Sequence, residues 1–472
     1  MSPPGIAKGG DSVSPNGTST AMQDSLLAAD LTTLWLLLAA FLVFFMQCGF
    51  ALLEAGSVRL KNTKNILLKN VVNTCISATT WWAVGYAFAR GECTSHSNPI
   101  IGLSSFFSAG GGASDDDPLY WALWLFSWVF AAVSVTIPSG ALAERCQFRA
   151  YLIYTFWQTG LIYPLVVHWV WSHEGWLSPF RVECGSGIPS VVFPRTMGVI
   201  DFAGSGNVHM TGGGAALMGA WILGPRIGRF SEDGVMAFMR PNSPTSQALG
   251  TFILWFGWYG FNPGSTGCMY GCLRLASKIA VNTTLAAAAG SLSALLSETL
   301  MGAPGDIAPV LNGILAGLVG ITSACAVVEH YAAVIIGVVA GLIMILTSKL
   351  LRRMRIDDPL DSVAVHFACG IWGIVAVGFF ATKAGVAAAY PQTPLVDWGV
   401  FYGGSGNQLG IQILGAAAIG VTTLALNGMG FGVLRALGCL RVPTKVEEDG
   451  LDHSQSIGTG KLGSFSCCLG SV

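Results

Sequence analysis

Apolar stretches close to 20 residues long recur from one end of this sequence to the other. They fall roughly at 32–54, 66–88, 119–142, 149–171, 200–223, 247–264, 276–298, 306–325, 327–349, 359–380 and 408–436. A helix of about 20 residues crosses the roughly 30 Å hydrocarbon core of a lipid bilayer. Only 10% of the residues are charged, whereas about a quarter of a typical soluble domain is. The sequence therefore predicts an all-α polytopic membrane protein with about eleven transmembrane helices.

Arginine and lysine gather in the gaps after the first, third, fifth and ninth apolar stretches, for example at Arg59, Arg145, Arg226 and Arg352. The alternate gaps are mostly longer, richer in Gly and Ser and poorer in basic residues. Because basic loops stay in the cytoplasm, this pattern predicts that the N-terminus lies outside and the C-terminus inside. Pro138, within the third stretch, predicts a bend in that helix.

The expected division of the chain has three parts. These are a polar extracellular N-terminus (1–31), a membrane domain (32–437) and a cytoplasmic tail (438–472). The polar start lacks a basic segment followed by a short apolar core, so no cleaved signal peptide is predicted. Asn16 begins an Asn-Gly-Thr sequon, which can be glycosylated only if the N-terminus lies outside the cell.

Charge and cysteine content narrow the functional classes. A net charge of −1 argues against nucleic-acid binding. The 12 cysteines show no pair at zinc spacing, and we predict neither a metal nor a cofactor. Cys93 and Cys184 fall in polar loops expected outside, where a disulfide is allowed. Cys467 and Cys468 in the tail are either palmitoylated or, as we favour, an unmodified pair.

A repeated pattern, Asp-x6-Val-His-x3-Gly, is the most informative feature. It places His209 eight residues after Asp201, and His366 eight residues after Asp358. Eight helical residues rise about 12 Å, so each histidine approaches the membrane midplane. The two copies enter the membrane from opposite sides, which predicts an inverted five-plus-five repeat followed by one C-terminal helix.

Each of these residues also has a purely structural interpretation. A lone intramembrane histidine can be a buried neutral imidazole bonded to another helix. Asp201 and Asp358 stand where carboxylates cap helices. For the symmetric histidine pair we favour a functional role, because ionisable groups at that depth usually face a pathway.

Five segments resemble one known family. They are DFAGSGNVHMTGG at 201–213, GFALLEAG at 49–56, SGALAER at 139–145, WFGWYGFNPGS at 255–265 and DDPLDSVAVHFACG at 357–370. Together they resemble the Amt/Mep/Rh ammonium transporters, most closely the plant-type Amt branch.

The resemblance implies a plasma-membrane homotrimer that takes up ammonium or ammonia through a pore in each protomer, with methylammonium as an analogue. It also implies roles for single residues: recruitment of the cation by Trp171, Ser265, Phe130 and Asp201; a gate of Phe130 and Phe261; and a pore lined by His209, His366 and Trp258. Asp358 is the helix-end carboxylate of the second repeat.

The chemistry of these residue types fits that assignment. Aromatic faces attract a cation, and a serine hydroxyl accepts an N–H bond, so ammonium can be held at an outer site. Neutral imidazoles offer both a donor and an acceptor, which suits the passage of ammonia and the relay of a proton. With 15 Trp and 25 Phe in the chain, however, most aromatic residues must serve packing alone.

The resemblance also implies a regulatory tail, where plant-type members carry Gly-Met-Asp-x-Thr. The chain has Gly450-Leu451-Asp452-His453-Ser454 at this place, with Ser for Thr. The flanking residues depart from the family pattern. A protein kinase acting on Ser454 is a candidate partner.

Three other functions compete with this prediction. A secondary transporter of another small amine or cation is the nearest. A membrane metalloenzyme is disfavoured because no HxxH or HxxxH motif occurs, so we do not expect an enzyme. An ammonium sensor would need a sizeable output domain, for which the tail is short.

Overall fold

The computed structural model describes residues 17–91, 98–108, 117–181, 197–231, 236–302, 306–393 and 397–454. Across these residues the chain is helical, with two isolated bridges and no strand. Asn16, Cys93, Cys184, Cys467 and Cys468, and with them the predicted modifications, lie outside the described residues.

Each of the eleven predicted apolar stretches coincides with a helix or a run of joined helical segments. In chain order they are α1 (Gly17–Ser57); α2 (Thr63–Thr80) with η2 (Trp81–Gly85) and α3 (Tyr86–Ala89); α4 (Pro118–Thr136) with α5 (Pro138–Ala141); α6 (Phe148–Trp157) with η4 (Gln158–Ile162) and α7 (Tyr163–Trp171); η5 (Ser205–Met210) with α8 (Thr211–Leu223); α9 (Pro244–Phe261); α10 (Leu273–Leu300); α11 (Ala308–Thr322); α12 (His330–Arg353); η7 (Val363–Ala368) with α13 (Cys369–Phe380); and α15 (Asn407–Ala436).

Short helices complete the described chain. They are η1 (Leu60–Asn62), η3 (Phe106–Ser108), η6 (Pro263–Thr266), α14 (Lys383–Ala389), η8 (Val400–Tyr402), α16 (Thr444–Asp449) and α17 (Leu451–Ser454). The helix is interrupted at the proline for which a bend was predicted: α4 ends at Thr136 and α5 begins at Pro138, while Ile137 between them keeps helical angles.

Seven of these helices are long and apolar enough to cross a membrane by themselves. They are α1, α4–α5, α6–α7, α10, α12, η7–α13 and α15. The remaining predicted spans correspond to helices that are shorter or more polar. The all-helical polytopic fold is thereby confirmed.

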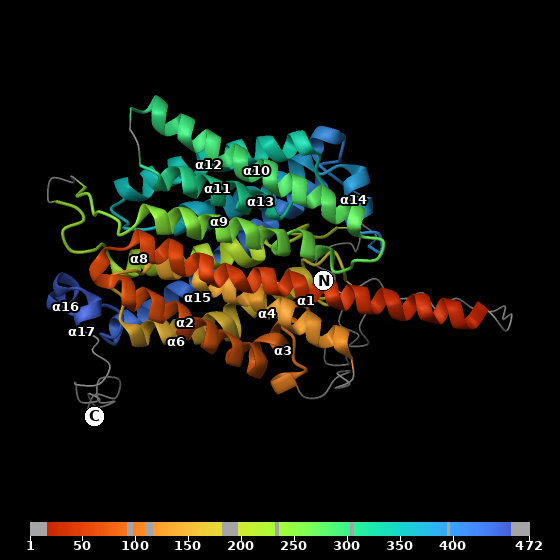
Figure 1. Cartoon of the computed structure of the whole chain (residues 1–472), viewed down its shortest axis with the longest axis horizontal. Helices are drawn as coiled ribbons and strands as arrows, with labels where there is room; N and C mark the ends of the chain where they lie inside the picture. The colour runs from red at the N-terminus through yellow and green to blue at the C-terminus, as the bar shows by residue number, and fades with distance from the viewer. Residues whose placement is uncertain are drawn as a thin grey trace.

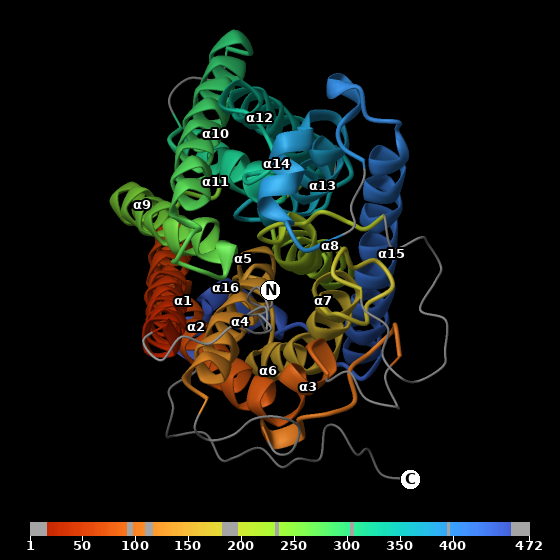
Figure 2. The ribbon, with the colours of Figure 1, turned by 90° about the vertical axis from the view of Figure 1, so that its right-hand side faces the viewer.

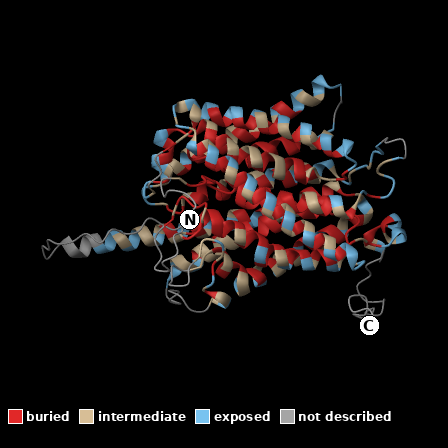
Figure 3. Cartoon of the chain, turned by 180° about the vertical axis from the view of Figure 1, so that it is seen from behind, coloured by how far each residue is buried: buried red, intermediate tan, exposed pale blue. Residues whose placement is uncertain are grey.

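The long helices run side by side along the longest axis of the molecule (Figure 1). Seen from one end, α2–α7 gather on one side and α10–α14 on the other, while α1 lies against α9 and α8 against α15 (Figure 2). Buried residues fill the interior, and exposed ones lie on the periphery (Figure 3). Large apolar side chains such as Leu38, Phe41, Phe252 and Leu346 are exposed on that periphery. A surface of this kind suits contact with lipid.

Helix α1 is longer than predicted. It has 41 residues, which corresponds to about 60 Å, roughly twice the hydrocarbon thickness. Its first part projects beyond the rest of the bundle (Figure 1). The expected helix start at 32 is therefore too late. Residues 18–31 contain three Ala, three Leu, one Met and one Gln but no Pro, so they favour a helix whether or not lipid surrounds them.

The loops at one end of the bundle form a buried ionic network, and we call this end the basic end. Arg226 donates to both carboxylate oxygens of Asp357 at 2.7 and 3.0 Å and lies 3.2 Å from Glu144. Glu144 in turn accepts from Arg59 at 2.5 Å. Burial alone would raise the pKa of Asp357, but the guanidinium groups of Arg145 and Arg226 hold it well below its ordinary value.

The tail packs against the same end. The carboxylate of Asp452 accepts the backbone N–H groups of Lys64 and Asn65, at the start of α2. Gly450 has φ +100°, and a Cβ there would meet Lys61. Ser454 closes α17. Gly450, Asp452 and Ser454, the three predicted tail residues, thus lie in a segment that packs against the loop between α1 and α2.

Candidate functional site

Both histidines sit in broken helix starts of the same design. His209 lies in the π-helical segment η5 and His366 in the π-helical segment η7. The Oδ2 atom of Asp201 accepts from the N–H of the residue five positions on, at 3.1 Å, and Oδ2 of Asp358 does the same at 2.7 Å. Each aspartate therefore satisfies donors that a helix start leaves open. Both aspartates therefore bond to the start of the following helix, as predicted, and each does so with the residue five positions on.

The glycine of each repeat lets the two halves cross closely. A Cβ on Gly213 would lie 2.3 Å from the backbone nitrogen of Phe367. A Cβ on Gly370 would lie 2.7 Å from the carbonyl oxygen of Ser205. Each glycine thus packs against the broken segment of the other half. This reciprocal crossing brings the two histidine-bearing segments together.

The histidines are in direct contact at the centre of the bundle. Their Nδ1 atoms are 3.3 Å apart, so one ring donates to the other. The ring centroids are 5.3 Å apart and the rings are nearly parallel. Nε2 of His209 is buried without a hydrogen-bond partner among the residues described. That nitrogen is available to a small polar guest.

Trp258 and Phe261 of α9 hold the ring of His209. The Trp258 ring stacks on it at 5.1 Å and the Phe261 ring at 5.4 Å between centroids. Trp258 is itself fixed, because its Nε1 donates to Thr322 at 3.0 Å. The predicted pore-lining tryptophan therefore lies against the histidine pair.

The two predicted gate residues are stacked on each other. The Phe130 and Phe261 rings are 4.0 Å apart with an angle of 20° between their planes. Both side chains are buried, and no polar atom belongs to either ring. Since Phe261 also touches His209, the phenylalanine pair closes one end of the histidine site with an apolar barrier.

Beyond this barrier, away from the basic end, lies a small pocket that we call the opposite-end pocket. Phe130, Trp171 and Ser265 line it together, as the sequence predicted for the recruitment residues. The Phe130 and Trp171 rings meet edge to face at 6.0 Å. The Ser265 hydroxyl donates to the carbonyl of Phe261 at 2.8 Å, so its oxygen remains an acceptor.

Asp201 contributes to this pocket differently from the prediction. Its carboxylate does not line the pocket; it accepts from Gly206, Asn207 and the Ser323 hydroxyl. Its backbone carbonyl instead accepts from Nε1 of Trp171 at 2.8 Å. Asp201 therefore sets the position of the tryptophan, and its carboxylate completes the broken helix.

Asp358 opens toward a second cavity, at the basic end. This cavity is also lined by Arg226, Asp357 and Asp361. Burial, together with the nearby Asp361 carboxylate, raises the pKa of Asp358 to about 7. Within the described chain, the Oδ1 atom of Asp358 is buried without a partner.

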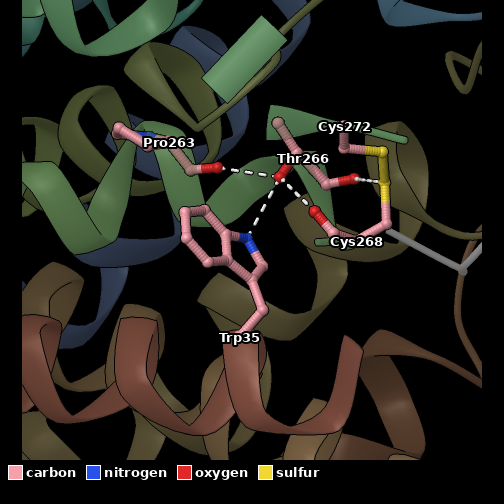
Figure 4. The surroundings of a disulfide bond; sticks show 5 residues. All are labelled: Trp35, Pro263, Thr266, Cys268 and Cys272. Carbon is pink, nitrogen blue, oxygen red and sulfur yellow. Dashed lines mark hydrogen bonds between the residues drawn. A yellow bond between two sulfur atoms is a disulfide. The ribbon is translucent and has the colours of Figure 1, made fainter. Parts of the chain in front are cut away.

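Two features of the opposite-end pocket were missed by the sequence analysis. Arg90, which directly follows α3, lines it. A disulfide between Cys268 and Cys272 closes the loop that follows Ser265 (Figure 4). The sequence did contain a signal for Arg90, because this arginine stands in the gap after the second apolar stretch, where few basic residues are expected. The two cysteines gave none, because disulfide pairing cannot be deduced from spacing along the sequence alone.

Groups of three or more potential metal ligands do not occur among the described residues. What the site does offer is a row of aromatic rings and two contacting imidazoles, from Trp171 through Phe130 and Phe261 to the histidines.

Comparison with known proteins identifies the family. The sequence profile of the Ammonium Transporter Family matches residues 34–460. The chain belongs to the ammonium transporter family. It is 38% identical over 456 residues to Ammonium transporter 3 of Dictyostelium discoideum, covering 96% of this chain and 99% of that protein. It is 41% identical to Ammonium transporter 1 member 1 of Arabidopsis thaliana, covering 86% and 80% of the two chains. The predicted family, including its plant-type branch, is confirmed, and it is a family of transporters rather than of enzymes.

Solved structures agree. A protein described as "Sensor Amt Protein" superposes with a TM-score of 0.78 at 31% identity, covering 92% of this chain and 100% of that one. Mep2 of Saccharomyces cerevisiae superposes with a TM-score of 0.75 at 29% identity, covering 88% of each chain. This ammonium transporter family member therefore shares its fold with Amt and Mep proteins along nearly its whole length.

Proposed function

We propose that this chain takes up ammonium across the plasma membrane through one pore in each protomer of a homotrimer. One observation carries the proposal: a cation-attracting aromatic pocket, an apolar gate and a histidine pair follow one another in direct contact. In the proposed orientation the opposite-end pocket faces outside, and the basic end with the tail faces the cytoplasm.

Recruitment takes place in the opposite-end pocket. The faces of Trp171 and Phe130 attract the ammonium ion by cation–π interaction, and the Ser265 oxygen accepts one of its N–H bonds. Asp201 supports the site by holding Trp171 through its carbonyl. An ion that keeps its charge would then meet two stacked phenyl rings, where it has no compensating partners.

Passage beyond the gate requires loss of a proton. Ammonium becomes ammonia, and the proton goes either to water outside or to the histidine pair. Ammonia then meets the open Nε2 of His209, which can accept from it or donate to it. Trp258 keeps the His209 ring in the orientation that presents this nitrogen. Whether the proton follows along the histidines decides whether uptake carries current.

The docked tail suggests a means of control. Gly450 and Asp452 fix the tail on the loop before α2, and Ser454 is the proposed substrate of a kinase. A phosphate there adds about −1.5 to −2 charges, beside an acidic segment that includes Glu448, Asp449 and Asp452. Loss of the docked state would then change transport.

Expression in a yeast strain lacking its own ammonium transporters tests the function. Growth on low ammonium and uptake of labelled methylammonium are expected. The control is a Phe130→Ala, His209→Ala, His366→Ala triple variant with equal surface expression. Absence of growth and uptake with wild-type protein at the cell surface would refute the proposal.

The competing substrate class is separated by one further probe. A transporter of small cations in general would carry tetramethylammonium, which cannot lose a proton. The phenylalanine gate predicts that this ion is excluded while methylammonium is taken up. A sensor without flux would bind methylammonium and show no uptake.

A further inference from the structure

Arg90 places a guanidinium group in the pocket that is proposed to recruit a cation. It lines that pocket together with Phe130, Trp171 and Ser265. Its Nη1 atom donates to the carbonyl oxygen of Trp171, and its Nη2 atom donates to the Ser127 hydroxyl, both at 3.3 Å. The positive charge is therefore held in place beside the aromatic faces.

The hydrogen-bond partners of the Arg90 guanidinium are neutral groups. Among the residues that the structure describes, no carboxylate oxygen lies within 4.0 Å of the Arg90 nitrogens. The Asp201 carboxylate is engaged with Ser323 and the backbone of η5. The carbonyl of Trp171 is the C-terminal end of α7, whose partial negative charge offsets part of the guanidinium charge. Part of the positive charge remains.

We propose that Arg90 is an affinity-setting residue: its charge weakens the binding of ammonium in the opposite-end pocket and so speeds its departure toward the gate. Two like charges repel more strongly in a partly buried pocket than in water. The repulsion opposes the cation–π attraction of Trp171 and Phe130. Conduction needs binding that is strong enough for entry and weak enough for release. The inference rests on the proposed function.

The experiment compares two substitutions with opposite predictions. Arg90→Gln removes the charge but keeps N–H donors for Trp171 and Ser127. It is expected to lower the half-saturating methylammonium concentration about tenfold, equivalent to about 1.4 kcal/mol. Arg90→Lys keeps the charge and should stay near wild type. A fixed positive charge repels all monovalent cations. Caesium should therefore inhibit uptake more strongly in Arg90→Gln, by a factor similar to the gain in methylammonium affinity, and inhibition should not change in Arg90→Lys. Arg149→Gln, which removes an exposed positive charge that does not line this pocket, is the matched control.

A role in positioning Trp171 alone predicts other results. Arg90→Gln would then show an unchanged or higher half-saturating concentration, or Arg90→Lys would behave as Arg90→Gln does, and either result overturns the proposal. Calorimetric titration of purified full-length protein with methylammonium measures the same affinity without flux. If wild type binds but carries no uptake, the proposed function fails, while the order of affinities among the variants still decides the role of Arg90.

Discussion

His209 and His366 form a direct polar contact between the two halves of the molecule. With their Nδ1 atoms 3.3 Å apart, the hydrogen positions on the two rings are linked, since one must donate when the other accepts. A change in one ring therefore changes what the other can offer to a guest. This linkage is the property that separates a working pair from two packing residues.

Substitutions of the pair test the linkage. His209→Ala and His366→Ala should each lower flux or relax selectivity toward potassium, and the double variant should cost less than the sum. His366→Glu should admit a cation more readily, because a carboxylate stabilises charge in the pore. The measurement is the ammonium-to-potassium current ratio at equal surface expression. Leu346→Ala, at an exposed position of α12, is the control. A ratio that stays at the wild-type value in every variant would make the histidines packing residues.

Gly213 and Gly370 determine how close the histidines come. Gly213→Ala or Gly370→Ala forces a methyl group against backbone of the other half, where overpacking costs about 1–3 kcal/mol. Both variants should lose thermal stability and flux together. Gly410→Ala is the matched control, since that glycine also lies within a helix but a Cβ there meets nothing within 4 Å. Wild-type flux and melting temperature in both test variants would contradict the crossing argument.

At the scale of elements, the segment after α9 is fixed by two local devices. The Thr266 hydroxyl oxygen accepts from Nε1 of Trp35 in α1 at 3.1 Å (Figure 4). The disulfide between Cys268 and Cys272 closes the next turn. Ser265 directly precedes Thr266 and lies three residues before Cys268. A disulfide at this end agrees with the extracellular location proposed for it, because such bonds persist in oxidising compartments.

Loss of the bridge should therefore loosen Ser265. Cys268→Ser, Cys272→Ser and the double variant should raise the half-saturating methylammonium concentration equally, by about threefold, or somewhat under 1 kcal/mol. A membrane-impermeant reductant should reproduce the change in wild type but not in the double variant. Cys75→Ser, at an exposed free cysteine, is the control. Single variants that differ from the double variant would show that the thiols, and not the bridge, matter.

For the whole molecule, the periodic apolar stretches were sufficient to predict all eleven helical segments, because bilayer thickness sets their length. The repeat predicted the meeting of the histidines, because motif residues at equal depth in inverted halves must converge. The start of α1 was not predictable from hydropathy, since a helix outside the lipid needs no apolar residues. The role of the Asp201 carbonyl and the place of Arg90 depend on three-dimensional packing between α3, α7 and η5, which spacing along the chain does not encode.

The network at the basic end couples the two halves, so its central carboxylate should control global stability. Glu144 belongs to the first half and Asp357 to the second, and Arg226 pairs with both. Asp357→Asn leaves Arg226 buried with one fewer counter-charge, and breaking a buried pair costs about 3–5 kcal/mol. We expect a lower melting temperature for the purified protein at pH 7. Asp449→Asn, at an exposed residue, is the control.

The pH dependence of that difference has a definite sign. The folded pKa of Asp357 lies well below its unfolded value of 3.8. Its contribution to stability is therefore fully present above that value and is lost as the pH falls toward the folded pKa. The melting-temperature gap between wild type and Asp357→Asn should be constant from about pH 5 to 8 and shrink in stronger acid. A gap that instead opens or closes near neutral pH would show that another group dominates the network, and that Asp357 does not hold the halves together.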